Sequence, residues 1–166
     1  MPSMKILLIA GGWSSEREVS LTGARGMQEA LLKRGHAVTF FDLLENFDEL
    51  LETARQHDFA LINLHGSPGE DGLVQAMLEK AGCPYQGSGP SGSFLALNKA
   101  AAKQIFRMAG LPTADWEFLP VRPAEGWEPR LPWPLFVKTT TGGSSLRLGR
   151  ATNRQELDAL MDEIFA

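Results

Sequence analysis

Short apolar runs alternate with amphipathic segments over the first half of the chain, and this alternation constrains the fold more than any other feature. The apolar runs are expected to form strands at residues 5–10, 37–43 and 59–64. Apolar positions at helical spacing predict helices at residues 20–34, 47–54 and 73–81. A short fourth strand is expected to begin at Pro84. Strands that alternate with helices indicate a parallel sheet covered on both faces, so we expect an α/β fold with a Rossmann-like first domain.

The pattern changes after a Gly- and Ser-rich segment at residues 87–92, where Ser91 is expected to cap a helix. The second part is predicted to contain a helix at 94–109, a Pro- and Trp-rich stretch at 116–134, strands at 135–138 and 146–151, and a last helix opened by a capping box at 152–155. Two strands and one helix would make a thin core for this part. We therefore expect two domains, 1–95 and 96–166, of which the second is incomplete.

The composition excludes several classes of protein. The 166-residue chain has 16 Lys and Arg against 20 Asp and Glu, a net charge of −4 and no basic run longer than two residues, which argues against a nucleic-acid partner. Its early apolar run at residues 6–10 is shorter than a secretory segment of ~7–15 residues or a membrane span of ~20. A single cysteine, Cys83, fits a reducing compartment. We expect a cytoplasmic protein without a membrane partner.

Two polar loops follow the first and third predicted strands, at residues 11–16 and 65–72. Because ligands bind beyond the carboxyl ends of parallel strands, these loops are candidate binding loops. Glu16 could hold a substrate ammonium, whereas His65 could equally be a hydrogen-bonded loop histidine. The first loop lacks the G-x-G-x-x-G pattern of dinucleotide sites. One histidine beside two adjacent acids does not indicate a metal site, and we expect no metal ligands in this chain.

A second candidate site follows the strand at residues 135–138. Lys138 stands before three threonines, two glycines and two serines, which together offer a cation, hydroxyl groups and backbone N–H groups to a phosphate. A Gly/Ser hairpin turn would look similar. Lys99 could supply a second cation or be a solvated surface lysine. No Walker loop and no G-x-S-x-G elbow occurs in the sequence.

Taken in order, these segments resemble the D-alanine–D-alanine ligases of the ATP-grasp superfamily. The matching motifs, which extend over essentially the whole chain, lie at residues 11–21, 65–79, 84–89, 98–103, 110–113 and 137–145. The resemblance implies a parallel-sheet pre-ATP-grasp domain followed by the first, incomplete part of an ATP-grasp domain. It also implies that the chain is the N-terminal portion of a ligase and is inactive alone.

The activity implied by the resemblance is the ATP-dependent joining of two D-alanines through an acyl phosphate, for peptidoglycan precursor synthesis. Glu16 would bind the ammonium of the first D-alanine, and His65 would lie beside its carboxylate. ATP would be held by Lys99, Lys138, Gly143, Ser144 and Ser145. Ser144 would also position the substrate, so that Glu16 and Ser144 are the implied catalytic residues. Mg²⁺ is implied as a cofactor with ligands outside this chain, and a homodimer is compatible with the pattern.

Four positions differ from the usual family residues. Asn98 replaces an Asp, Thr139 a Pro, Gly142 a frequent acid and Arg147 a Gly. Two other functions stay open at this point. The chain could be a stand-alone amino-acid-binding or dimerisation module, or part of a ligase that takes D-serine or D-lactate as its second substrate.

Overall fold

A computed structural model describes residues 2–142 and 148–166 of the chain. The chain divides into two compact units, residues 1–95 and 96–166, which are described separately below. No helix among the residues described is long and apolar enough to cross a membrane.

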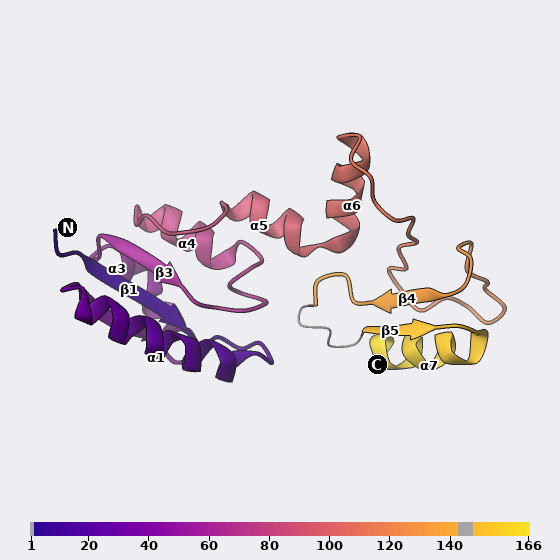
Figure 1. The fold of residues 1–166 in the computed structure, drawn as a ribbon, viewed down its shortest axis with the longest axis horizontal. Coiled ribbons are helices and arrows are strands. Elements are labelled where there is room, and N and C mark those ends of the chain that lie inside the picture. Colours follow the sequence, from indigo (N-terminus) through magenta and orange to yellow (C-terminus); the bar gives the residue numbers. More distant parts are fainter. Residues whose placement is uncertain (1, 143–147) are drawn as a thin grey trace. The chain divides into compact units, whose positions relative to one another are not determined.

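The first unit is built on a parallel sheet of three strands, β1 (Lys5–Ala10), β2 (Ala37–Asp42) and β3 (Phe59–Ile62), in the order β2-β1-β3. Figure 1 labels β1 and β3 of this sheet. The central strand β1 is almost entirely buried because both of its edges are paired. The predicted fourth strand is reduced to one parallel bridge between Ala60 and Tyr85. Pro84 accepts a hydrogen bond from Ala60 N at 2.8 Å but has no N–H of its own to extend the pairing.

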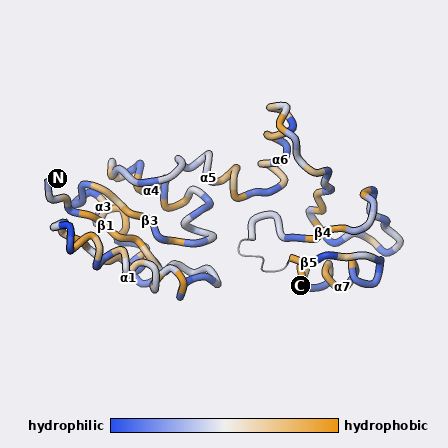
Figure 2. Tube along the Cα trace, viewed as in Figure 1, coloured by the Kyte–Doolittle hydropathy of each residue, from blue (hydrophilic) through white to orange (hydrophobic). Residues whose placement is uncertain are grey.

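Helices cover both faces of this sheet, as the uninterrupted apolar strands predict. On one face, Leu8 and Ala10 of β1 pack with Ala24 of α1 (Arg17–Lys33). On the other face, Leu7 and Ile9 pack with residues of α2 (Leu43–Asn46), α3 (Leu50–Ala54) and α4 (Leu73–Ala81). The apolar stretches of β1 and β3 stand out in the hydropathy colouring of Figure 2. The predicted α/β class with a parallel sheet is confirmed.

Two predicted helices are interrupted. The segment predicted as a helix at 47–54 is a 3₁₀ turn, η1 (Phe47–Glu49), followed by α3. The segment predicted as one helix at 94–109 is divided into α5 (Pro90–Leu97) and α6 (Lys99–Met108). Asn98 has extended backbone angles and accepts a hydrogen bond from Ala101 N at 3.0 Å, so it ends one helix and caps the next. Ser91 lies inside α5 and does not cap it, because Pro90 takes the first helical position.

The second unit contains the antiparallel pair β4 (Leu135–Lys138) and β5 (Leu148–Ala151), with α7 (Arg154–Phe165) packed on one face. Residues 146 and 147 of the predicted second strand lie outside the described residues. The capping box of α7 begins one residue later than predicted. Asn153, rather than Thr152, accepts from Glu156 N at 3.0 Å, while the Glu156 carboxylate accepts from Thr152 N at 2.7 Å.

Candidate functional site

A buried hydrogen-bond network joins the two candidate loops of the first unit. The Ser20 hydroxyl, which is fully buried, accepts from Gly11 N at 2.8 Å and donates to the Asn63 carbonyl oxygen. Asn63 Nδ2 in turn donates to the Ser20 carbonyl at 2.7 Å. The carboxyl ends of the neighbouring strands β1 and β3 are therefore tied to the same turn of α1, which fixes the edge of the sheet where a ligand would bind.

Glu16 lies beside the loop that begins at His65. A Cβ added at Gly66 would stand 3.9 Å from Glu16 Oε2 and 3.4 Å from Ser14 Cβ, so the missing side chain of Gly66 leaves room next to the carboxylate. Ser14 Oγ accepts from Glu16 N at 3.2 Å and steadies the approach to α1. The structure thus brings Glu16 and the 65–66 segment together, with His65 half-buried in that segment.

The acidic residues at 70 and 71 have structural partners. Glu70 closes the loop on Gly66, because its carboxylate accepts from Gly66 N at 3.1 Å and its own N–H donates to Gly66 O at 2.8 Å. Asp71 accepts from Leu73 N at 3.0 Å at the start of α4. Both interactions shape the loop that begins at His65.

An ion pair at the same edge of the sheet was missed by the sequence analysis. Arg17 binds Asp42, the last residue of β2, through two hydrogen bonds of 2.7 Å. The hydrogen bond from Arg17 holds the pKa of Asp42 below its ordinary value, and the same bond raises the pKa of Arg17. No direct signal for this pair was present in the sequence, because Arg17 and Asp42 are 25 positions apart and meet only when β1 and β2 pair in parallel.

In the second unit, Lys99 and Lys138 form the second candidate site. Lys99 Nζ donates to the carbonyl oxygens of Thr140 at 3.5 Å and Gly142 at 2.5 Å, in the turn that follows β4. Lys138 is exposed at the end of β4. Burial, and next to it the positive charge of Lys138, lower the pKa of Lys99. An anion such as phosphate bound beside the two cations would relieve this repulsion.

The rest of the predicted phosphate loop is only partly described. Gly143, Ser144 and Ser145 lie outside the described residues, as does Arg147. Two of the residues that differ from the family pattern are in contact, since a Cβ added at Gly142 would overlap Thr139 Oγ1. A larger residue at position 142 would therefore require the Thr139 side chain to move.

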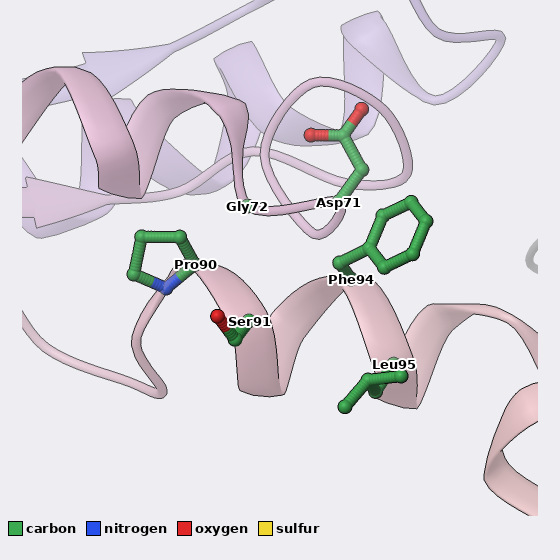
Figure 3. Close-up of a pocket in the computed structure, with 6 residues that line it drawn as sticks. All are labelled: Asp71, Gly72, Pro90, Ser91, Phe94 and Leu95. Atoms are coloured by element: carbon green, nitrogen blue, oxygen red, sulfur yellow. The ribbon is translucent and has the colours of Figure 1, made fainter.

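One further concavity lies in the first unit, an open pocket of about 440 Å³ lined mainly by apolar atoms (Figure 3). It lies between the Asp71–Gly72 turn and the side chains of Pro90, Ser91, Phe94 and Leu95 on α5. Its lining contains none of the predicted site residues. Within the described parts of the chain, there is no group of three or more His, Cys, Asp or Glu residues that could hold a metal ion.

The fold and these two clusters define an α/β protein with a carboxylate at the carboxyl edge of a parallel sheet and a lysine pair in a separate unit. Curated proteins of similar sequence are D-alanine–D-alanine ligases. Over 163 residues the chain is 76% identical to the D-alanine–D-alanine ligase of Desulfovibrio desulfuricans and 65% identical to that of Nitratidesulfovibrio vulgaris. These matches cover 98% of this chain but 53% and 54% of the two relatives.

Solved structures give the same result. The D-alanine–D-alanine ligase of Bacillus anthracis in complex with ATP is similar over 98% of this chain and 55% of its own, with a TM-score of 0.85 and 35% identity. The resemblance to the D-alanine–D-alanine ligases is therefore confirmed, and the chain spans about half the length of these proteins. No protein-family model matches the chain.

Proposed function

We propose that this chain supplies the first amino-acid-binding region and part of the ATP-binding region of a D-alanine–D-alanine ligase. The observation that carries the proposal is the 76% identity with the Desulfovibrio desulfuricans ligase over 98% of this chain. In this proposal, residues 1–95 are the substrate-side α/β domain and residues 96–166 begin the ATP-grasp domain. The relatives favour this function over a stand-alone binding or dimerisation module.

The proposed reaction has two steps. The carboxylate of the first D-alanine attacks the γ-phosphorus of ATP, which forms an acyl phosphate and releases ADP. The amine of the second D-alanine then attacks the acyl carbonyl carbon, loses a proton and expels inorganic phosphate, leaving the new peptide bond. Phosphorylation is needed because a carboxylate oxygen is a poor leaving group, whereas phosphate is a good one.

In the first unit, Glu16 would bind the ammonium of the first D-alanine through a charge-assisted hydrogen bond. His65, which precedes Gly66 in the adjoining loop, would lie beside the carboxylate that is phosphorylated. Ser144 would help to position this substrate. The location of Glu16 Oε2 near Gly66 supports the pairing of Glu16 with the 65–66 segment.

In the second unit, Lys99 and Lys138 would hold phosphate oxygens of ATP, together with Gly143, Ser144 and Ser145. Burial and then the charge of Lys138 lower the pKa of Lys99 from its ordinary value. This supports the assignment, because a bound phosphate would offset the repulsion between the two lysines. Mg²⁺ would neutralise phosphate charge when ATP is bound. The described residues offer no acidic cluster for the metal, so its ligands would come from elsewhere in the ligase.

The proposal extends to the setting of the reaction. A ligase that consumes ATP and makes a peptidoglycan precursor would work in the cytoplasm, where Cys83 would stay reduced. Exposed apolar side chains such as Phe94 and Leu95 are compatible with a homodimer.

A hybrid protein tests the proposed function. The 163 matching residues of the Desulfovibrio desulfuricans ligase are replaced by this chain, because the relatives are about twice as long. We expect the purified hybrid to release ADP from ATP only when D-alanine is present, and to form D-alanyl-D-alanine. L-alanine serves as the control substrate. A folded hybrid that binds ATP but makes no dipeptide would contradict the proposal.

A further inference from the structure

The ion pair between Arg17 and Asp42 has the geometry of a fixed clamp rather than of a surface salt bridge. Arg17 Nη1 and Nη2 each lie 2.7 Å from a different oxygen of Asp42, and Nη1 also donates to the Gly12 carbonyl at 3.3 Å. The side chains are only 24% and 13% exposed. A bidentate, mostly buried pair of this kind holds its orientation, whereas exposed pairs contribute little.

The backbone of the first loop is packed against this pair. Gly11 has a φ of +78°, and a Cβ at this position would overlap Arg17 Nη1 and stand 2.6 Å from Asp42 Oδ1. Only glycine combines this backbone angle with the close approach of the two charged groups. The loop that leads to Glu16 is therefore packed closely against the ion pair.

We propose that the Arg17–Asp42 pair is a positioning device for Glu16, an inference that rests on the proposed function of Glu16. Arg17 follows Glu16 in the chain, and its guanidinium anchors the start of α1 to β2 and to the Gly12 carbonyl. The backbone on either side is held by Arg17 N donating to Ser14 O at 3.2 Å and Ser20 N donating to Glu16 O at 3.1 Å. The Glu16 backbone is thereby fixed relative to the sheet edge.

The two halves of the clamp depend on each other. Arg17 supplies both donors and Asp42 both acceptors, so replacing either side chain breaks the bidentate contact. The start of α1 then loses its anchor to the end of β2. Arg17 therefore contributes the donors of the clamp, and Asp42 contributes its acceptors.

Three variants separate these contributions. Asp42→Asn removes the negative charge but keeps the size of the side chain and its cap on α2, where Asp42 accepts from Leu44 N at 3.1 Å. Arg17→Gln removes the positive charge, and the double variant removes both. Arg55→Gln is the matched control, because Arg55, the residue that follows α3, forms an exposed ion pair with Glu52 and has no part in the Arg17–Asp42 contact.

The first measurement is amide hydrogen exchange in the 166-residue chain. The amides of Arg17 and Ser20 are expected to exchange about tenfold faster in Arg17→Gln and Asp42→Asn, with no change in Arg55→Gln. The second measurement is the KM for D-alanine in the hybrid ligase. Because the two side chains act as one pair, Asp42→Asn and Arg17→Gln are each expected to raise this KM about tenfold, with the double variant no higher than about tenfold and the KM for ATP unchanged.

Unchanged exchange in both single variants would overturn the proposal. So would a D-alanine KM that keeps the wild-type value in both, or that rises together with the KM for ATP, as a general loss of structure would cause. If Arg17→Gln and Asp42→Asn do not fold, Arg17→Lys gives the same hydrogen-exchange test. Lysine keeps the positive charge but cannot make the two parallel hydrogen bonds of the guanidinium. A wild-type hybrid without D-alanine-dependent activity would contradict the proposed function, while the exchange data would still decide whether the pair holds the loop.

Discussion

At the scale of single residues, Lys99 is the most informative side chain of the second unit. It lies half-buried between two backbone carbonyls and close enough to Lys138 for the second charge to lower its pKa. Folding lowers the pKa of this lysine. Between the lowered pKa and the ordinary lysine pKa, the unfolded chain therefore binds more protons than the folded chain. Folding stability therefore rises as the pH increases through the lowered pKa of Lys99.

Replacing Lys138 by Met is expected to raise the pKa of Lys99, because the positive charge of Lys138 is removed while the burial of Lys99 remains. Adding ATP to the wild-type chain is expected to change it in the same direction. Both effects can be followed by NMR titration of ¹³C-labelled lysine side chains. Lys103→Met is the control, since Lys103 binds Thr113 and Ala114 instead. A Lys99 pKa that does not respond to Lys138→Met would contradict this account of the pair.

Asp42 gives a dependence on pH in the same direction, but in the acid range. Because Arg17 holds the folded pKa of Asp42 below its unfolded value, the ionised carboxylate stabilises the fold above the unfolded pKa. This contribution is lost as the pH falls from about 5 through the lowered pKa. The wild-type chain should therefore exceed Asp42→Asn in free energy of unfolding at pH 6, and the difference should shrink at pH 3. Urea unfolding at the two pH values measures it, with the exposed Asp48→Asn as control.

At the scale of elements, the central strand β1 carries both layers of the core. Leu7 faces the cluster with α3 and α4, whereas Leu8 faces α1. Such alternate burial on two faces is what an uninterrupted apolar run predicts for a central parallel strand. The loops that hold the candidate site extend from the ends of β1 and β3, so the position of the site depends on this packing.

Leu7→Ala is expected to lower the free energy of unfolding by about 2–5 kcal/mol, because it leaves a cavity at a fully buried position. Leu44→Ala, at an exposed position on α2, should change it by no more than about 0.5 kcal/mol. Equilibrium denaturation of both variants makes the comparison. A small effect of Leu7→Ala would mean that the sheet is not packed as described.

The positions of strands and most helices were predictable because apolar periodicity reflects burial directly. The breaks were not, because they depend on single polar side chains. Asn98 could have continued a helix, and only its hydrogen bond to Ala101 N shows that it starts a new one. In the site, Glu16 and Lys99 were candidates from their positions in the sequence, and the family resemblance implied their roles. The Arg17–Asp42 pair joins residues 25 positions apart and needed the strand order to be known.

At the scale of the whole molecule, the chain spans about half the length of its relatives. A nucleotide site completed by the remaining half would be weak in this chain alone. We therefore expect the 166 residues to bind ATP·Mg²⁺ with a Kd well above 1 μM, the affinity that corresponds to about −8 kcal/mol. Isothermal titration calorimetry of the chain and of the hybrid ligase gives the comparison, and sub-micromolar binding by the chain alone would contradict the expectation.

The central claim is that Glu16 binds the first D-alanine, and one measurement tests it most directly. D-alanine-dependent ADP release is compared between the hybrid ligase and its Glu16→Gln variant, with Glu18→Gln, an exposed acid on the first turn of α1, as the matched control. The loss of a charged partner for the ammonium should lower kcat/KM for D-alanine by about 100-fold or more. Glu18→Gln should keep the wild-type value. Near-normal turnover in Glu16→Gln would contradict the assignment.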